Sequence, residues 1–240
     1  MSFTSLTDAD RAAMLAAIGI DSIDELFAEI PEGVRLGRPL DVGPALSEAE
    51  LSAHMAELAG RNVDVGRELS FLGAGMYDHY VPAVVDMMMQ RGEFLTAYTP
   101  YQPEMSQGVL QAIFEYQTAI CELTGMDVSN ASGYDGTTVA ADACYVAKLA
   151  TGRTKVVVAE TLNPQARQVV RTFAPGFGME VVEVPHTDGA TDPDQVAAAA
   201  DGAALVIFQQ PNFLGVLEDA PALAAAAGAG GALPVAHVDP

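Results

Sequence analysis

Short strand-like and helix-like segments alternate from Lys155 onward in this 240-residue chain, and this alternation constrains the fold more than any other feature. Strand-like and helix-like runs follow one another at residues 155–160, 164–173, 179–184, 194–200, 204–209, 222–228 and 234–238. Strands that are separated by single short helices join through right-handed crossovers into a parallel sheet covered on both faces. The sequence therefore predicts an α/β fold with a parallel-rich sheet between helices.

The predicted sheet also indicates where a functional site should lie. In open parallel sheets, functional groups gather just beyond the carboxyl ends of the strands. In this chain those ends are Glu160 with Thr161, Pro185 with His186, residues 209–212, and Asp239. Only Asp239 and Pro240 follow the last strand, so we expect one edge of the sheet to be open.

The first part of the chain predicts a separate helical lead-in over residues 1–65, ahead of a partial large α/β domain over residues 66–240. Thr7 is placed to cap one helix, and Ser47 with Glu50 forms a capping box for another. The Pro- and Gly-rich stretch 31–44 between them is expected to be a linker or arm. A lead-in of this kind typically packs on a neighbouring domain or subunit.

A stiff polar segment precedes a helix that the apolar spacing predicts over residues 106–124. Thr99 and Gln102 each stand before a proline, which disfavours helical backbone and predicts an extended conformation. The segment offers candidate ligand- or partner-binding side chains: Tyr98, Tyr101, Gln102, Glu104 and Gln107. The alternative is a proline-rich connector whose tyrosines pack on the core.

The stretch just before this segment offers no cofactor motif. In GAGMYDHYVP, Asp78 stands where a dinucleotide fingerprint would need a third glycine. A short helix is predicted over residues 81–90, and its apolar side chains are expected in the core: Val84, Val85, Met88 and Met89.

Small residues open another predicted helix, over residues 139–149. The run from Asn130 to Thr138 places glycine, hydroxyl and free backbone N–H groups at the helix start, and that combination suits an anion. Its candidate binding residues are Ser132, Asp135, Gly136 and Thr137. The alternative is ordinary N-capping by Asp135 or Thr137, and the Asp135 carboxylate would also compete with a phosphate.

Composition excludes several classes of function. The net charge of -21 disfavours binding to nucleic acid or to an anionic membrane. The four histidines show no metal-ligand spacing, so no metal site is predicted, and Cys121 and Cys144 read as buried thiols in a reduced compartment. No basic start with an apolar run indicates secretion, so a cytoplasmic protein is expected.

Four runs carry a resemblance to a known family: FLGAGMYDHYVPAVVD, AYTPYQPEMSQGVLQAIFEYQTAICELTGMDVSNAS, YDGTTVAADA and QQPNFLGVLED. Together they closely resemble subunit 1 of the two-subunit P protein of the glycine cleavage system, glycine dehydrogenase (decarboxylating). The resemblance implies the type I fold of pyridoxal-phosphate-dependent transferases, and it agrees with the alternating pattern. Members of this family are much longer, so we expect an incomplete large domain.

The resemblance also implies a reaction and its cofactor. Pyridoxal phosphate would condense with glycine, the carboxylate would leave as CO2, and the aminomethyl group would pass to the lipoyl arm of the H protein. Such chemistry needs a lysine that holds the cofactor as a Schiff base. The two lysines, Lys148 and Lys155, fall in a helix and at the beginning of a strand, away from the strand ends.

We therefore expect the cofactor to be held by the lysine of subunit 2, in an assembly that the resemblance implies to be an α2β2 heterotetramer. This chain would carry a degenerate cofactor site, in which Ser132 to Thr138 correspond to the phosphate cradle and Asp239 to the partner of the pyridine nitrogen. The segment from Tyr98 to Gln107 would line the shared active-site mouth or the subunit interface. The alternative is a non-catalytic scaffold that only stabilises subunit 2.

Overall fold

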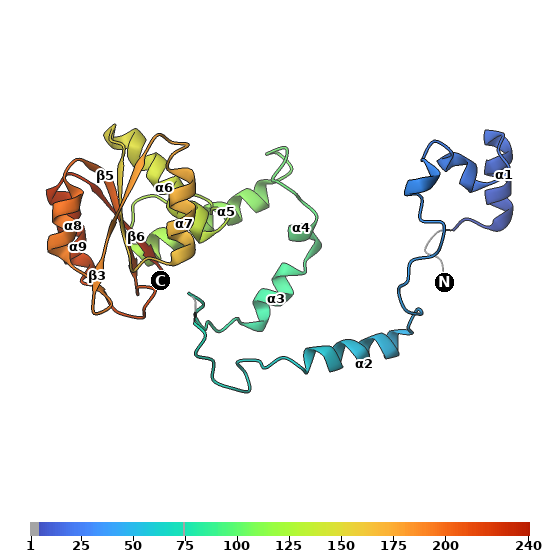
Figure 1. Ribbon diagram of the computed structural model, residues 1–240, viewed down its shortest axis with the longest axis horizontal. Helices are drawn as coiled ribbons and strands as arrows, with labels where there is room; N and C mark the ends of the chain where they lie inside the picture. Colours follow the sequence, from blue (N-terminus) through green and yellow to red (C-terminus); the bar gives the residue numbers. More distant parts are fainter. Residues whose placement is uncertain (1–4, 74) are drawn as a thin grey trace. The chain divides into compact units, whose positions relative to one another are not determined.

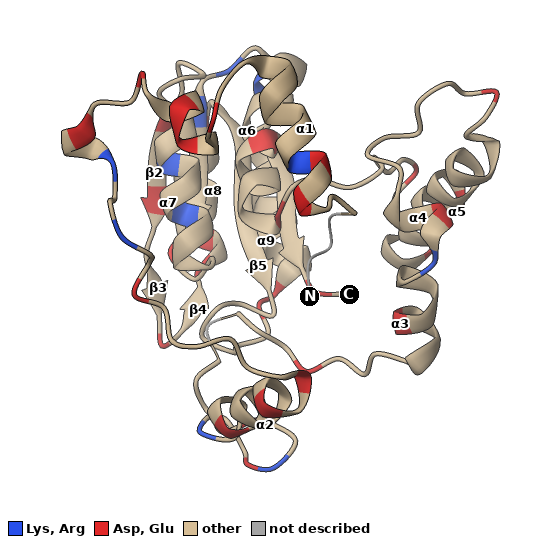
Figure 2. Ribbon diagram, turned by 90° about the vertical axis from the view of Figure 1, so that its right-hand side faces the viewer, with Lys and Arg blue, Asp and Glu red and all other residues tan. Residues whose placement is uncertain are grey.

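The computed structural model describes residues 5–73 and 75–240. The chain divides into two compact units, Met1–Leu69 and Ser70–Pro240 (Figure 1). This division lies close to the boundary predicted after residue 65. Figure 2 shows acidic positions on elements of both units and few basic ones, in keeping with 32 acidic and 11 basic residues.

The first unit consists of short helices joined by extended chain, and its bounds are α1 (Asp8–Ile18), η1 (Ile23–Phe27), η2 (Glu32–Val34) and α2 (Glu48–Ala59). Both predicted caps are confirmed: Thr7 forms a capping box with Asp10, and Ser47 forms one with Glu50. No described side chain of residues 5–69 is fully buried, so this unit has no core of its own.

The second unit begins with three helices, α3 (Ala83–Met89), α4 (Gly92–Leu95) and α5 (Gln107–Thr124). The expectation that the apolar side chains of the first helix lie in the core is wrong for this structure, because all four are exposed. Helix α5 likewise has no fully buried residue. Within the described residues, no element buries the apolar face of α3, whereas Leu110, Ile113 and Ile120 on α5 are half-buried.

The α/β part follows, and it contains α6 (Gly136–Thr151), β1 (Lys155–Ala159), α7 (Pro164–Phe173), β2 (Glu180–Val184), β3 (His186–Thr187), β4 (Ala190–Thr191), α8 (Pro193–Ala200), β5 (Ala203–Gln210), α9 (Ala220–Ala229) and β6 (Leu233–Val238). The main sheet has the order β2-β1-β5-β6, and all its pairings are parallel. The predicted strand–helix alternation is confirmed, whereas the small β3–β4 hairpin was not predicted.

Helices cover both faces of the sheet, with α6 and α7 on one side and α8 and α9 on the other (Figure 1). Alternate residues of each strand enter the two cores: Val156 and Val158 pack with α6 and α7, while Val157 and Ala159 pack with α8 and α9. This two-sided burial explains why the strands are continuous apolar runs.

The two cysteines differ in burial. Cys144 is buried in the α6 core, and burial raises the pKa of its thiol to about 11. The prediction of a buried thiol is therefore confirmed for Cys144, while Cys121 is only half-buried. Both are free thiols.

Candidate functional site

Three parallel strands end at one polar pocket, as the sheet topology predicts. The pocket lies at the carboxyl ends of β1, β5 and β6 and encloses about 290 Å³. Its lining comprises Gly75, Tyr77, His79, Asn163, Gln209, Pro211, His237, Val238 and Asp239. Of the predicted strand-end groups, Gln209, Pro211 and Asp239 line it. The other predicted groups do not line it: Glu160, Thr161, Pro185, His186, Gln210 and Asn212.

The buried side-chain amide of Gln209 lines this pocket. Gln209 is only 4% exposed, and its side-chain oxygen accepts a hydrogen bond of 2.8 Å from the backbone N–H of Asn163. Asn163 in turn caps α7, through a bond from the N–H of Gln165 to its side-chain oxygen. The ends of β1 and β5 are thereby fixed to each other.

Residues 75–79 contact this edge from a distant part of the chain. The His79 Nε2 atom lies 3.0 Å from the Asp239 Oδ2 atom, and Gln209 Nε2 donates to the Tyr77 hydroxyl at 3.4 Å. Gly75 has φ +80°, and a Cβ there would lie 2.8 Å from Asn163 Nδ2. Sequence reasoning missed this contact, although glycine is the residue suited to both a positive φ and a close approach.

The start of α6 lies beside the same edge, since a Cβ on Gly136 would lie 3.4 Å from His237 Cε1. Its N-terminus is closed by the chain itself: Asp135 accepts 2.7 Å bonds from the Thr138 N–H and the Thr137 hydroxyl. The Thr137 hydroxyl and then the Thr138 N–H hold the pKa of Asp135 below its usual value. The capping alternative is therefore confirmed for Asp135.

Two other groups at this edge have distinctive environments. Ser132, another predicted cradle residue, adopts φ +106°, which is unusual for a residue with a side chain. Burial lowers the pKa of His237, which favours the neutral form of its imidazole. A neutral ring beside a capped helix start provides no cation for a phosphate.

Both lysines of the chain lie at the opposite edge of the sheet. Lys148, near the end of α6, donates to the carbonyl of Phe177, and Lys155, at the start of β1, donates to the carbonyl of Asp201. Neither amine faces Asp239. Asp135 caps the helix start where a phosphate would bind, and His79 contacts the Asp239 carboxylate. Because no lysine lies nearby, the residues of this edge do not fit a covalently held pyridoxal phosphate.

The predicted Tyr–Pro residues are not brought to the pocket, because none of Tyr98, Tyr101, Gln102, Glu104 and Gln107 lines it. Their side chains are exposed, so the alternative of tyrosines packed on the core is wrong for this structure.

The predicted extended backbone is also wrong at Gln102, which has φ +56°. The Gln102 carbonyl accepts bonds from the N–H groups of Met105, at 2.9 Å, and Ser106, at 3.1 Å. The proline after Gln102 excludes the right-handed helical region, and the chain satisfies that restriction with a left-handed turn that leads into α5.

A buried carboxylate that sequence reasoning missed organises the loop after β5. Glu218 is 6% exposed and accepts bonds of 2.9 Å from the Thr161 hydroxyl and the Thr191 N–H, and of 2.8 Å from Asn212 Nδ2. The Asn212 side-chain oxygen closes the loop by accepting from the N–H groups of Leu214 and Val216. Glu218 thus joins the turn after β1, strand β4 and its own loop after β5.

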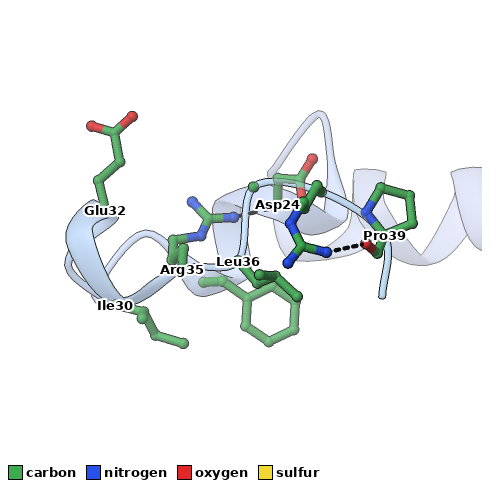
Figure 3. A pocket seen from close by; sticks show the side chains of 9 residues that line it. Asp24, Ile30, Glu32, Arg35, Leu36 and Pro39 are labelled. Carbon is green, nitrogen blue, oxygen red and sulfur yellow. Dashed lines mark hydrogen bonds and ion pairs between the residues drawn. The ribbon is translucent and has the colours of Figure 1, made fainter. Parts of the chain in front are cut away.

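The first unit contains a larger hollow, which we do not assign to a ligand. It encloses about 780 Å³, and Figure 3 shows Arg35 directed toward Asp24. Arg38 Nη1 donates to the Pro39 carbonyl at 3.1 Å. Both guanidinium groups already have partners in the chain. The lining is exposed, so no buried polar group is available to select a ligand.

Residues 5–73 and 75–240 contain no group of three His, Cys, Asp or Glu side chains arranged to hold a metal ion. None of the helices described in the structure combines the length and apolar character needed to cross a bilayer.

The parallel sheet, its two helix layers and its polar carboxyl edge define an α/β architecture. The solved structures that match it place the chain in the type I fold of pyridoxal-phosphate-dependent enzymes. A solved glycine decarboxylase (P-protein) of the glycine cleavage system, in inhibitor-bound form, matches with a TM-score of 0.78 and 40% identity, over 100% of this chain and 53% of that one. A sphingosine-1-phosphate lyase of Burkholderia pseudomallei, 16% identical with a TM-score of 0.56, shares the fold. The predicted fold class is confirmed.

The family model described as "Glycine cleavage system P-protein" matches residues 1–240, and the chain belongs to that family. Two relatives named "Probable glycine dehydrogenase (decarboxylating) subunit 1" are each 52% identical. The protein of Geobacillus kaustophilus matches 92% of this chain and 50% of its own length, and that of Geotalea uraniireducens matches 100% and 54%. The chain thus spans about half the length of these curated relatives.

Proposed function

We propose that this chain acts as subunit 1 of a glycine decarboxylase, the P protein of the glycine cleavage system. The complex decarboxylates glycine with pyridoxal phosphate and passes the aminomethyl group to the lipoyl arm of the H protein. Support comes from the family match over the whole chain and from relatives that carry the name of this subunit. A lysine-bearing subunit 2 completes the proposed α2β2 heterotetramer.

The positions of the two lysines support the assignment of the cofactor to subunit 2 and not to this chain. Both amines donate to backbone carbonyls at the amino edge of the sheet, while Asp239 and the α6 start lie at the carboxyl edge. A Schiff base requires an amine within reach of the cofactor aldehyde. We therefore assign the cofactor to subunit 2 and a supporting surface to this chain.

The segment from Tyr98 to Gln107 is the part of that surface we assign to the shared active-site mouth or the subunit interface. Tyr98 and Tyr101 are fully or largely exposed, and tyrosine is enriched at protein interfaces, where its ring is buried and its hydroxyl finds a partner. Tyr101 lies directly before the hydrogen-bonded turn at Gln102, and its N–H donates to the Thr99 carbonyl at 2.7 Å.

A purely structural role is the second candidate, and the carboxyl edge favours it. His79 contacts the Asp239 carboxylate, and Asp135 accepts a hydrogen bond from a backbone N–H at the start of α6. The polar groups of the degenerate site therefore already have partners within this chain. A scaffold subunit would need no ligand there. The two candidates differ in whether the exposed segment affects turnover once the complex has assembled.

Reconstitution tests the proposed function. We expect subunit 2 with pyridoxal phosphate and lipoylated H protein, which accepts the aminomethyl group, to show glycine-dependent CO2 release only when this chain is added. This chain alone, with the cofactor and borohydride, should gain no adduct by mass spectrometry. Activity of subunit 2 that is independent of this chain would contradict the proposal, and so would a reduced adduct on Lys148 or Lys155.

Replacement of Tyr98 or Tyr101 by alanine should lower glycine-dependent activity of the assembled complex roughly tenfold, as expected for exposed aromatic anchors of a shared surface. Tyr116→Ala on α5 is the matched control, because Tyr116 is also exposed but lies outside the segment. Activity is normalised to complex measured by light scattering. Full activity of both variants in normally assembled complex would support the scaffold role instead.

A further inference from the structure

The chain between Gly75 and α3 reaches the carboxyl edge of the sheet without forming regular secondary structure. Every second residue of its first part lines the pocket at that edge: Gly75, Tyr77 and His79. Residues between and beyond them point away, since Met76 is 84% and Tyr80 is 90% exposed. Such alternation is typical of extended chain. We call residues 75–80 the strap, and its inner side faces the pocket.

Two polar contacts hold the inner side of the strap against the strand ends. Gln209 Nε2, on β5, donates to the Tyr77 hydroxyl at 3.4 Å, and His79 Nε2 lies 3.0 Å from Asp239 Oδ2, directly after β6. The hydrogen bond to Tyr77 is long, and the side chains of His79 and Asp239 are 61% and 32% exposed. Each contact therefore favours the closed strap by only roughly fivefold in population.

The two ends of the strap differ in character from its middle. Gly75 has φ +80°, a backbone conformation that glycine adopts readily, and a Cβ there would lie 2.8 Å from Asn163 Nδ2. At the other end, Pro82 caps α3, which begins at Ala83. Because side-chain contacts and not strand pairing hold the strap, it can leave the edge without breaking a strand or a helix.

We propose that the strap is a lid that opens and closes over the pocket at the carboxyl edge, and that the structure shows its closed state. Lids of this kind move about a few positions at their ends. When Tyr77 and His79 leave the edge, the Asp239 carboxylate and the amides of Asn163 and Gln209 become accessible.

The chemistry of the opened pocket indicates what the lid admits. No lysine or arginine is among the residues described as lining it. A carboxylate and two amides instead suit a small ligand that donates hydrogen bonds, such as an amide or an ammonium compound, rather than a phosphate. This inference does not depend on the proposed glycine chemistry.

The test measures access to the pocket with a cysteine reporter in the full 240-residue chain. His237 lines the pocket and is half-buried, so His237→Cys places a thiol where the closed strap covers it. The probe is iodoacetamide, a small uncharged amide that the net charge of -21 does not repel. Peptide mass spectrometry follows its reaction with the reporter and with Cys121, a half-buried thiol on α5 outside the pocket.

With the His237→Cys reporter present, Tyr77→Phe should raise the alkylation rate of the reporter roughly fivefold, because it removes one hydrogen bond of the closed strap. His79→Ala should act similarly, and both changes together should raise the rate at least roughly tenfold. Met76→Ala on the outer side is the matched control and should leave the rate within roughly twofold. The rate at Cys121 should not change in any variant.

Three results would overturn the lid. One is an unchanged reporter rate in the Tyr77→Phe, His79→Ala double variant, which would mean that the strap does not control access. Another is equal acceleration at Cys121, which would mean a general loss of stability. The third is acceleration by Met76→Ala as large as that by Tyr77→Phe. Circular dichroism checks folding, and Tyr77→Phe retains the ring, so it tests the lid even when His79→Ala is unfolded.

Discussion

Replacing Glu218 by leucine should destabilise the second unit by about 3–5 kcal/mol, since each buried donor that loses its acceptor costs about 1–3 kcal/mol. Leucine fits the volume but removes the acceptor of Thr161, of the Thr191 N–H and of Asn212. The loop after β5 would lose the carboxylate that joins it to Thr161 and Thr191. The measurement is the free energy of unfolding of the second unit in urea, followed by circular dichroism.

Two variants separate this effect from loss of charge. Glu218→Gln retains one acceptor oxygen and should lose roughly half as much stability as leucine, because part of the network remains bonded. Glu180→Leu removes an exposed carboxylate from β2 and should change stability by less than about 0.5 kcal/mol. A Glu218→Leu protein within about 1 kcal/mol of the wild type would show that the buried network contributes little.

The sequence was sufficient for elements whose signals are local. The strands at 155–159 and 203–210 follow from buried apolar runs, and the helices that begin after Thr7 and Ser47 follow from their capping boxes. These features depend on residues only a few positions apart. The same reason accounts for the correct capping alternative at Asp135, whose bonds reach only Thr137 and Thr138.

The missed features depend on residues that only the folded chain brings together. Glu218 lies 57 positions from Thr161, and His79 lies 160 positions from Asp239. An isolated Glu or His in the sequence gives no sign of a distant partner. Gly75 was the available signal, because a glycine that is neither a helix end nor part of a fingerprint can mark a close approach.

The apolar helices before α6 show a different limit of sequence reasoning. Their spacing correctly predicted α3 and α5, but not whether anything covers them. Periodicity identifies the face that a helix would bury and is silent on its partner. The exposed apolar face of α3 is therefore a surface that a partner polypeptide would cover in the proposed assembly.

Substitution of alanine for Gly230 and for Gly228 should change the free energy of unfolding in opposite directions, although the two glycines are only two positions apart at the end of α9. A Cβ on Gly230 would lie 2.7 Å from both the carbonyl carbon and oxygen of Ala200, where backbone at the end of α8 cannot move aside. Gly230→Ala should therefore cost about 2–3 kcal/mol by overpacking. Gly228 lies inside α9 with nothing within 4 Å, so alanine there should add about 0.5–1 kcal/mol through helix propensity.

The pair also tests the packing of α8 against α9 that supports one face of the sheet. Urea unfolding of the two variants gives each change in stability, and the double variant should show their sum within about 0.5 kcal/mol, provided that the two methyl groups do not interact. Equal destabilisation by both variants would mean that the cost of alanine at Gly230 comes from the end of the helix and not from the contact with Ala200. Stabilisation by Gly230→Ala would mean that α8 and α9 are further apart in solution than the 2.7 Å contact implies.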